Sequence, residues 1–219
     1  MNDWFPLWLS LRVSLIATLV AAVVGVALAY VLAKWQSRWT SIVEAVFTLP
    51  IVLPPTVLGY YLLTLLGSRS ALGKTWESLV GSPLVFSASG AVVAATISAL
   101  PFVIRAARAA ISNVDTRVEE AARIMGFSEW KVARIVTLPL ASRGIGAGVA
   151  LGFARALGDF GATVMVAGNI PGQTQTLPIA VYDAVQAGDD ATARTGSLVL
   201  AGIAVVVLIL VTHVFARRR

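Results

Sequence analysis

The sequence predicts an all-α integral membrane protein with about five transmembrane helices in a single domain over residues 1–219. Composition is the first reason, because 58% of the residues are hydrophobic and 13% are charged, with a mean hydropathy of +0.83. A soluble domain carries roughly 25% charged residues. The second reason is that the apolar residues form long runs, and about 20 such residues span a bilayer as a helix.

The predicted spans follow these runs, and the second one contains Pro50, Pro54 and Pro55. Each proline removes a backbone donor, and a break within the bilayer is tolerated only where protein or a cavity satisfies the freed carbonyls. The prolines therefore indicate either a passive kink or a bend that lines a transport path. In order, the spans cover about 9–33, 43–67, 86–104, 144–167 and 195–215.

The basic residues predict the orientation. Of the 17 Lys and Arg, twelve fall in one set of predicted loops, including Arg38 and residues 217–219, and four fall in the opposite set. Because cytoplasmic loops carry the excess of basic residues, we expect the N-terminus outside and the C-terminus in the cytoplasm of an inner-membrane protein. A cleaved signal peptide is the alternative for the first run, but Lys34 and Arg38 follow that run, which favours a retained helix. Interfacial tryptophans flank it, namely Trp4, Trp8, Trp35 and Trp39.

Several chemistries are excluded by what the sequence lacks. It has no cysteine and a single histidine, His213, which excludes disulfides, thiolate metal sites and a bis-His haem within one chain. His213 itself is interpreted as an interfacial residue. The pattern G-x-x-x-x-G-K-[ST] does not occur, so ATP cannot be held in a P-loop of this chain. The net charge of +6 is explained by cytoplasmic loops, so nucleic acid is not expected as a partner.

The longest polar stretch, residues 105–143, predicts two short helices at the cytoplasmic surface. Thr116 and Glu119 fit a capping box, Glu119 and Arg123 have the spacing of a favourable helical pair, and Gly126 is a natural stop. Ser128 is expected to cap a second helix that ends at Pro139. The pair either rests on lipid headgroups or docks on a cytoplasmic partner through its Gly-Phe turn.

The same stretch, EEAARIMGFSEWKVARIVTLPL, resembles the EAA loop of ABC importer permeases. Val136 stands where that pattern has Ile. The resemblance implies the type I importer permease fold and a coupling loop that docks on a separate ABC ATPase, which would bind ATP and Mg²⁺. It also implies a homodimer carrying two ATPase subunits. The expected coupling residues are Glu120, Ala121, Ala122, Gly126, Phe127, Ser128, Leu138 and Pro139.

Three further segments are similar to molybdate permeases: LPIVLPPTVLGYYLL (49–63), FARALGDFGAT (153–163) and NIPGQTQTLPIAVY (169–182). Asp159 stands where those relatives usually carry Glu. Sulfate and tungstate permeases share part of the pattern, so both substrates are alternatives to molybdate. The resemblance implies an extracytoplasmic oxyanion-binding protein as a partner, and the loop from about 168 to 194, with a short helix at 177–187, is the expected docking surface.

Arg155 and Asp159 are the two charges within the fourth span. Such charges each cost about 2.5–3.5 kcal/mol on insertion scales, so they form either a structural salt bridge or part of a gate. Gly158 and Gly161 are expected to allow close helix approach. With one intraspan Arg, a strong oxyanion site in the spans is not expected. The candidate pathway residues are Arg155, Gly158, Asp159, Phe160, Gly161 and Thr163, with Pro50, Pro54 and Pro55.

Two other classes compete with a permease. A standalone channel or ion-coupled transporter would work without ATP, and the coupling-loop pattern argues against it. A membrane enzyme or redox subunit would need ligands and a catalytic constellation that one His and one acid–base pair do not supply.

Overall fold

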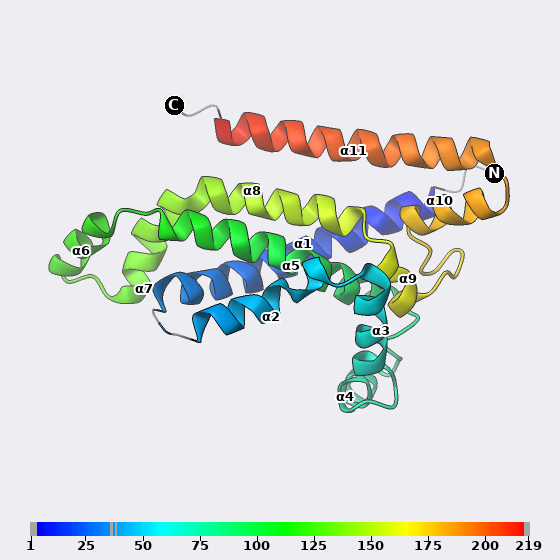
Figure 1. The fold of residues 1–219 in the computed structure, drawn as a ribbon, viewed down its shortest axis with the longest axis horizontal. Helices are drawn as coiled ribbons and strands as arrows, with labels where there is room; N and C mark the ends of the chain where they lie inside the picture. The colour runs from blue at the N-terminus through cyan, green and yellow to red at the C-terminus, as the bar shows by residue number, and fades with distance from the viewer. Residues whose placement is uncertain (1–3, 36, 38, 217–219) are drawn as a thin grey trace.

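The fold is built on four long helices that lie roughly side by side (Figure 1). The computed structural model describes residues 4–35, 37 and 39–216. Within them, four helices are long and apolar enough to cross a membrane, and a bent helix pair makes up to five spans. The predicted all-α membrane class is confirmed. The four are α1 (Phe5–Lys34), α5 (Ala88–Ser112), α8 (Leu138–Leu157) and α11 (Asp190–Ala216).

Small residues let α1 and α8 approach α5 closely. Ala91, Ala95 and Ala99 of α5 are fully buried in a cluster with Ala17 and Ala21 of α1. A methyl group at any of three α8 glycines would lie under 3.0 Å from the nearest α5 side chain. Close backbone approach of this kind is the usual basis of helix association in lipid. These glycines are Gly144, Gly148 and Gly152.

The second predicted span, 43–67, is not one helix. It is divided into α2 (Thr40–Val52) and α3 (Pro55–Leu66), which are bent by 114° relative to each other. The break falls at Leu53 and Pro54, both in extended conformations. From there α3 leads away from the long helices to α4 (Ala71–Val80), as Figure 1 shows. The interruption predicted from the prolines is therefore present, and it is a sharp bend between two helices.

The fourth predicted span, 144–167, has the wrong boundaries. Its helix begins earlier, because Glu129–Leu157 is one candidate span, and it ends at Gly158. The short helix α9 (Gly161–Ala167) follows as a separate element. The N–H of Phe86, whose φ is 55°, donates to the Val166 carbonyl at 2.8 Å and so joins the end of α9 to the segment before α5.

The predicted loop 105–143 is also too wide, because the helices on both sides of it extend into this range. Helix α5 continues through Arg105 and Arg108 to Ser112, because Arg is a good helix former and Arg108 pairs with Glu44 of α2. Only residues between Ser112 and Glu129 lie outside the candidate spans here. They hold α6 (Thr116–Ile124), which is followed by α7 (Glu129–Val132).

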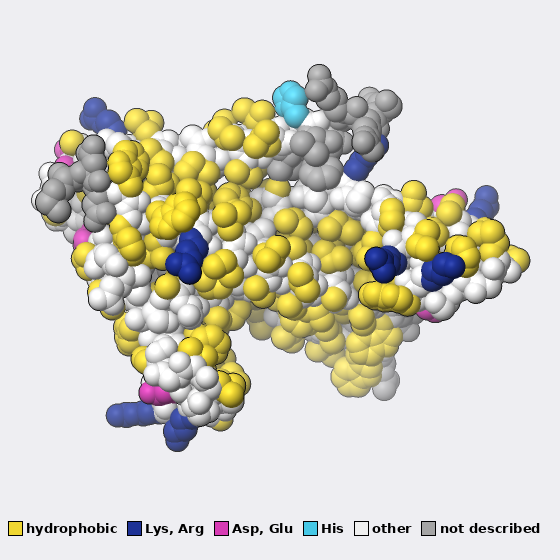
Figure 2. All heavy atoms as spheres, turned by 180° about the vertical axis from the view of Figure 1, so that it is seen from behind, with side chains coloured by type: hydrophobic (Ala, Val, Ile, Leu, Met, Phe, Trp, Pro, Cys, Tyr) yellow, Lys and Arg dark blue, Asp and Glu magenta, His cyan; other side chains and the backbone are white. Residues whose placement is uncertain are grey.

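Lys and Arg side chains lie at both ends of the face shown in Figure 2, and hydrophobic side chains cover the belt between the ends. At the end opposite α6 and α7, α10 (Leu177–Gln186), predicted at 177–187, lies beside α1, where the Leu177 N–H donates to Ser10 Oγ at 2.7 Å. The predicted basic residues Arg38 and 217–219 lie outside the described residues. All four tryptophans flanking α1 are exposed.

Candidate functional site

The α6–α7 hairpin turns at Gly126, as the sequence predicts. Gly126 has a φ of 84°, a left-handed conformation that favours glycine. Its N–H donates to the Arg123 carbonyl at 2.9 Å, and the Phe127 N–H donates to the Ala122 carbonyl at 3.2 Å. These bonds satisfy carbonyls that the end of α6 leaves free. The turn is therefore a defined helix stop.

Large apolar side chains project from the hairpin into solvent. Ile124 is 87% exposed, Met125 68% and Trp130 74%. Phe127 is half-buried and carries the Lys131 ammonium over its ring, 3.9 Å from the centroid. Among the predicted coupling residues, Glu120, Ala121 and Ser128 are also exposed, whereas Ala122 is buried. An exposed apolar cluster rimmed by charge is typical of an interaction surface.

The start of α6 differs from the predicted capping box. Asp115, not Thr116, is the N-cap, and its carboxylate accepts from the Arg117 N–H at 2.9 Å. Glu119 therefore does not reach back over the helix start. Ser128 lies at the N-cap of α7 as predicted, but its side chain makes no capping hydrogen bond.

Glu119 turns inward and meets side chains from two other elements. Lys34 Nζ, at the end of α1, lies 2.6 Å from both carboxylate oxygens, and Thr137 Oγ1 donates to Oε1 at 2.6 Å. The Glu119 side chain is 2% exposed. Burial alone would raise the pKa of this carboxyl, but the hydrogen bonds from Lys34 and Thr137 and the charges of Lys34 and Arg123 hold the pKa below its ordinary value.

Arg123 connects α6 to α7. Its guanidinium lies 2.7 Å and 3.2 Å from the Glu129 carboxylate oxygens and 3.8 Å from Glu119, which agrees with the predicted helical pair. The hydrogen bond to Glu129 is the main cause that raises the pKa of Arg123 above its ordinary value. The hairpin is thus closed internally by one exposed ion pair.

Leu138 and Pro139 do not end the second hairpin helix, which corrects the prediction. The chain continues from α7 through a π-helical turn, Ala133–Thr137, directly into α8. Pro139 lies in the first turn of α8, where its missing N–H is tolerated. The motif's carboxyl-terminal half is therefore the first part of a spanning helix.

The two broken segments meet at Gly161. A methyl group there would lie 2.6 Å from Pro55 Cβ, and one at Gly59 would lie 2.6 Å from Met165 Cβ. Glycine at both positions thus allows α3 to pack on α9. Gly158 differs, because a methyl group there would meet only the Ala154 carbonyl oxygen of its own helix, at 3.5 Å. The predicted role in helix approach is confirmed for Gly161 and wrong for Gly158.

Asp159 lies in the break between α8 and α9 and is 2% exposed. One carboxylate oxygen contacts Arg155 at 2.8 Å and accepts from Ser98 Oγ of α5 at 3.1 Å. The other accepts from the Thr163 N–H at 3.0 Å and hydroxyl at 2.7 Å. The predicted Arg155–Asp159 pair is present, but the two residues do not share a helix. Phe160, next to them, packs on Tyr182 of α10, with ring centroids 4.9 Å apart.

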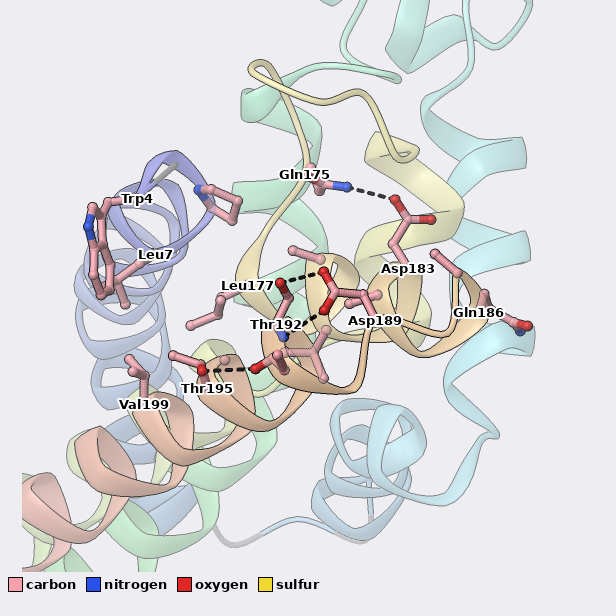
Figure 3. A pocket seen from close by; sticks show the side chains of 17 residues that line it. Trp4, Leu7, Gln175, Leu177, Asp183, Gln186, Asp189, Thr192, Thr195 and Val199 are labelled. Carbon is pink, nitrogen blue, oxygen red and sulfur yellow. Dashed lines mark hydrogen bonds between the residues drawn. The ribbon is translucent and has the colours of Figure 1, made fainter. Parts of the chain in front are cut away.

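A cavity of about 800 Å³ opens at the opposite end, between α1, α10 and α11 (Figure 3). Trp4, Leu7 and Val199 form part of its apolar wall. Its polar side chains bond mostly to one another: Gln175 donates to Asp183 at 3.1 Å, and Thr192 donates to Asp189 at 2.6 Å. Most of its lining belongs to the loop 168–194 predicted as a docking surface, and the rest comes from the start of α1 and from α11.

The described residues contain no cluster of three or more His, Cys, Asp or Glu that could hold a metal ion.

Sequence reasoning missed Lys34 and Thr137 as partners of Glu119. Lys34 is 85 positions away and Thr137 is 18, and nothing local in the sequence links them.

Comparisons with known proteins show which family this chain belongs to and which proteins it is similar to. The family described as "Binding-protein-dependent transport system inner membrane component" matches residues 14–218. A molybdenum transport system permease protein of Haemophilus influenzae is 44% identical over 156 residues, covering 70% of this chain and 68% of that protein. A sulfate transport system permease protein of Synechococcus elongatus is 36% identical over 177 residues, covering 81% of this chain and 62% of that protein.

Two solved structures share the fold. One is an inward-facing MetNI methionine ABC transporter, with a TM-score of 0.73 at 20% identity, covering 99% of this chain and 98% of that chain. The other is a bacterial alginate ABC transporter in complex with an alginate pentasaccharide-bound periplasmic protein, with a TM-score of 0.75 at 16% identity. It covers 100% of this chain and 80% of that chain. At such identities the likeness concerns the fold alone.

Proposed function

This chain belongs to the family of inner-membrane components of binding-protein-dependent transport systems, and on that basis we propose that it is the permease subunit of an ATP-driven molybdate importer. The molybdenum transport relative at 44% identity supports this substrate over sulfate, whose transport relative is 36% identical. Tungstate, another tetrahedral oxyanion, is the remaining alternative. ATP-independent channels do not fit a family that works with binding proteins.

The exposed α6–α7 hairpin is the observation that carries the proposal. It presents Ile124, Met125 and Trp130 to solvent in a segment that also carries Arg117, Arg123 and Lys131. Aromatic and aliphatic anchors of this kind fill pockets on a partner. We assign the hairpin to docking on a cytoplasmic ABC ATPase, which supplies ATP and Mg²⁺ binding because this sequence has no P-loop. The proposed docking residues are those predicted above, with Glu120 and Phe127 at the surface and Leu138 and Pro139 at the root.

The assembly follows from the same proposal. As a multi-pass inner-membrane protein, the chain would have its N-terminus outside and its hairpin in the cytoplasm. A second copy would complete the path, with one ATPase on each hairpin, and an oxyanion-binding protein would deliver substrate to the end that carries α10. The α2 and α3 faces that a second copy would cover expose Val46, Val52 and Tyr60.

The gate is proposed to lie where the two broken segments meet. Pro54 and Pro55 lie at the start of α3, with Pro55 beside Gly161, and Asp159 holds the other break through Ser98 and Thr163. Broken helices in membranes occur where they line a cavity or are buried in protein. Pro50, Arg155, Gly158 and Phe160 complete the candidate set.

The test is substrate-stimulated ATP hydrolysis by the reconstituted complex. The chain, its ATPase and its binding protein are placed in proteoliposomes, and molybdate, tungstate and sulfate are added in turn. We expect molybdate to stimulate hydrolysis and to be imported. Gly126→Ala should weaken ATPase binding roughly tenfold or more, because strain at a left-handed residue costs about 1–2 kcal/mol.

Gly188→Ala is the matched control for that variant. Gly188 has a φ of 73° and, like Gly126, open space around it, but it lies at the end of α10, away from the hairpin. It should show comparable strain with unchanged ATPase binding. Equal loss of binding in both variants, or import that does not require ATP, contradicts the docking assignment.

A further inference from the structure

A buried three-residue cluster joins the proposed docking hairpin to the spans; we call it the Glu119 network, and it consists of Lys34, Glu119 and Thr137. All three contacts to the Glu119 carboxylate are 2.6 Å long. They come from the last residue of α1 and the last residue of the π-helical turn that begins α8. One side chain of the hairpin therefore contacts the start of one span and the end of another.

These contacts are the strong kind of hydrogen bond. The carboxylate is charged and buried, with a 2% exposed side chain, and its main partner is a charged ammonium. Charge-assisted bonds are about twice as strong as neutral ones, and a buried charge is tolerated only when it is paired and hydrogen-bonded. Displacing α6 without moving α1 and α8 would break all three 2.6 Å contacts and leave the carboxylate only Arg123, 3.8 Å away on α6, so the three elements are held together.

The neighbouring ion pair makes a useful contrast. Arg123 and Glu129 bond at 2.7 Å, but both belong to the hairpin, and Glu129 is 69% exposed. Exposed pairs contribute little because solvent screens them. That pair links α6 only to Glu129, the first residue of the candidate span Glu129–Leu157, and makes no contact with α1. Among these acidic groups, the link to α1 therefore passes through Glu119.

We propose that Glu119 is the positioning residue that carries movement of the docked hairpin to α1 and α8 together, through Lys34 and Thr137. This inference rests on the proposed function, since it presumes an ATPase bound to the hairpin. It assigns a role to the residue before the predicted motif position Glu120, which is exposed and available to the partner. Docking and transmission are thereby divided between adjacent carboxylates that face opposite ways.

The experiment measures molybdate imported per ATP hydrolysed by the reconstituted complex. Glu119→Gln keeps the shape and the hydroxyl contact but removes the charge. We expect the ratio to fall roughly fivefold or more, within the usual range of coupling free energies, while the ATPase still binds. Lys34→Gln should behave alike, and the double variant should be no worse than either single one. Exchanging the charges, Lys34→Glu with Glu119→Lys, should restore part of the ratio.

The control is Asp115→Asn, which removes one carboxylate from the same loop at an exposed position and keeps a good N-cap residue. Its ratio should match that of the unmodified complex. If Glu119→Gln folds poorly, Thr137→Val removes one hydrogen bond with little change in volume and should lower the ratio in the same direction. An unchanged ratio in the Glu119 and Thr137 variants, or strictly additive losses with Lys34→Gln, overturns the inference. Failure of the unmodified complex to respond to molybdate overturns the proposed function instead.

Discussion

At the scale of single residues, Glu119 is where local and long-range effects conflict. Its spacing from Thr116 predicts a capping box, yet Asp115 occupies the N-cap and Glu119 is buried against Lys34 and Thr137. A capping box uses only neighbours along the chain, so it is visible in a sequence. A partner 85 positions away is not, and here it provides the stronger interaction. Gly126 was predictable because its role is local.

The Glu119 network should make stability depend on pH in a defined direction. The pKa of Glu119 is lowered in the folded protein. The stabilisation from its charged carboxylate is therefore present above the ordinary pKa of about 4.3 and is lost as the pH falls through the folded pKa. We expect the unmodified chain to have a higher melting temperature than Glu119→Gln at neutral pH. The difference should shrink below about pH 4.3.

The measurement is thermal unfolding in detergent across this range. In a Lys34→Gln background the same comparison should show a much smaller difference, because the partner charge is gone. A difference between the Glu119 forms that persists unchanged to the lowest pH would contradict the assignment of the stabilisation to the charged carboxylate.

At the scale of helices, the sequence predicts breaks better than it predicts boundaries. Pro54 and Pro55 locate the interruption between α2 and α3, because a missing N–H acts locally, whereas Pro50 is accommodated inside α2. The 114° angle depends on how α3 packs against α9, which no local pattern encodes. The predicted boundary of α5 was wrong because Arg105 and Arg108 were interpreted as loop residues. Helix propensity and the ion pair between Arg108 and Glu44 extend α5 past both residues.

Packing of α3 on α9 gives a prediction at this scale. Gly161→Ala places a methyl group 2.6 Å from Pro55 Cβ, and overpacking typically costs about 1–3 kcal/mol. We expect a lower melting temperature and reduced molybdate import, since the crowding falls beside the proposed gate. Thermal unfolding and uptake measured on the same preparation check both effects.

The comparison variant is Gly202→Ala in α11, where nothing lies within 4 Å of the added methyl group. It should be neutral or slightly stabilising, because alanine favours a helix by up to about 1 kcal/mol over glycine. Should both variants lose the same stability, the loss would reflect glycine replacement in general and not contact between α3 and α9.

At the scale of the whole molecule, composition and hydropathy predicted the all-α membrane class, because a helix must carry an apolar run of about 20 residues to cross a bilayer. Sidedness rests on the distribution of Lys and Arg alone. The described chain offers a direct test, because it has no cysteine to create background labelling. Single cysteines can therefore report each end of the bundle.

We expect Lys74→Cys and Gln173→Cys to react with a membrane-impermeant maleimide added outside intact spheroplasts. Asn113→Cys and Thr116→Cys, both between the candidate spans, should react only after the membrane is opened. All four positions are exposed, so accessibility to the reagent decides the result. Labelling of Asn113→Cys from outside would show that the orientation is the opposite of the proposed one, and the hairpin would then lie on the side of the membrane that a cytoplasmic ATPase cannot reach.

The separation of Lys34 from Glu119 also has a consequence for biogenesis. Ribosomes add about 5–20 residues per second, so the 85 positions between them correspond to about 4–17 s in which the lysine exists without its carboxylate. If this end of α1 is cytoplasmic, as proposed above, the positive charge of Lys34 would favour its retention there while the helix enters the bilayer. The carboxylate arrives later and pairs with the lysine. The same lysine would thus contribute first to the orientation of α1 and then to the Glu119 network.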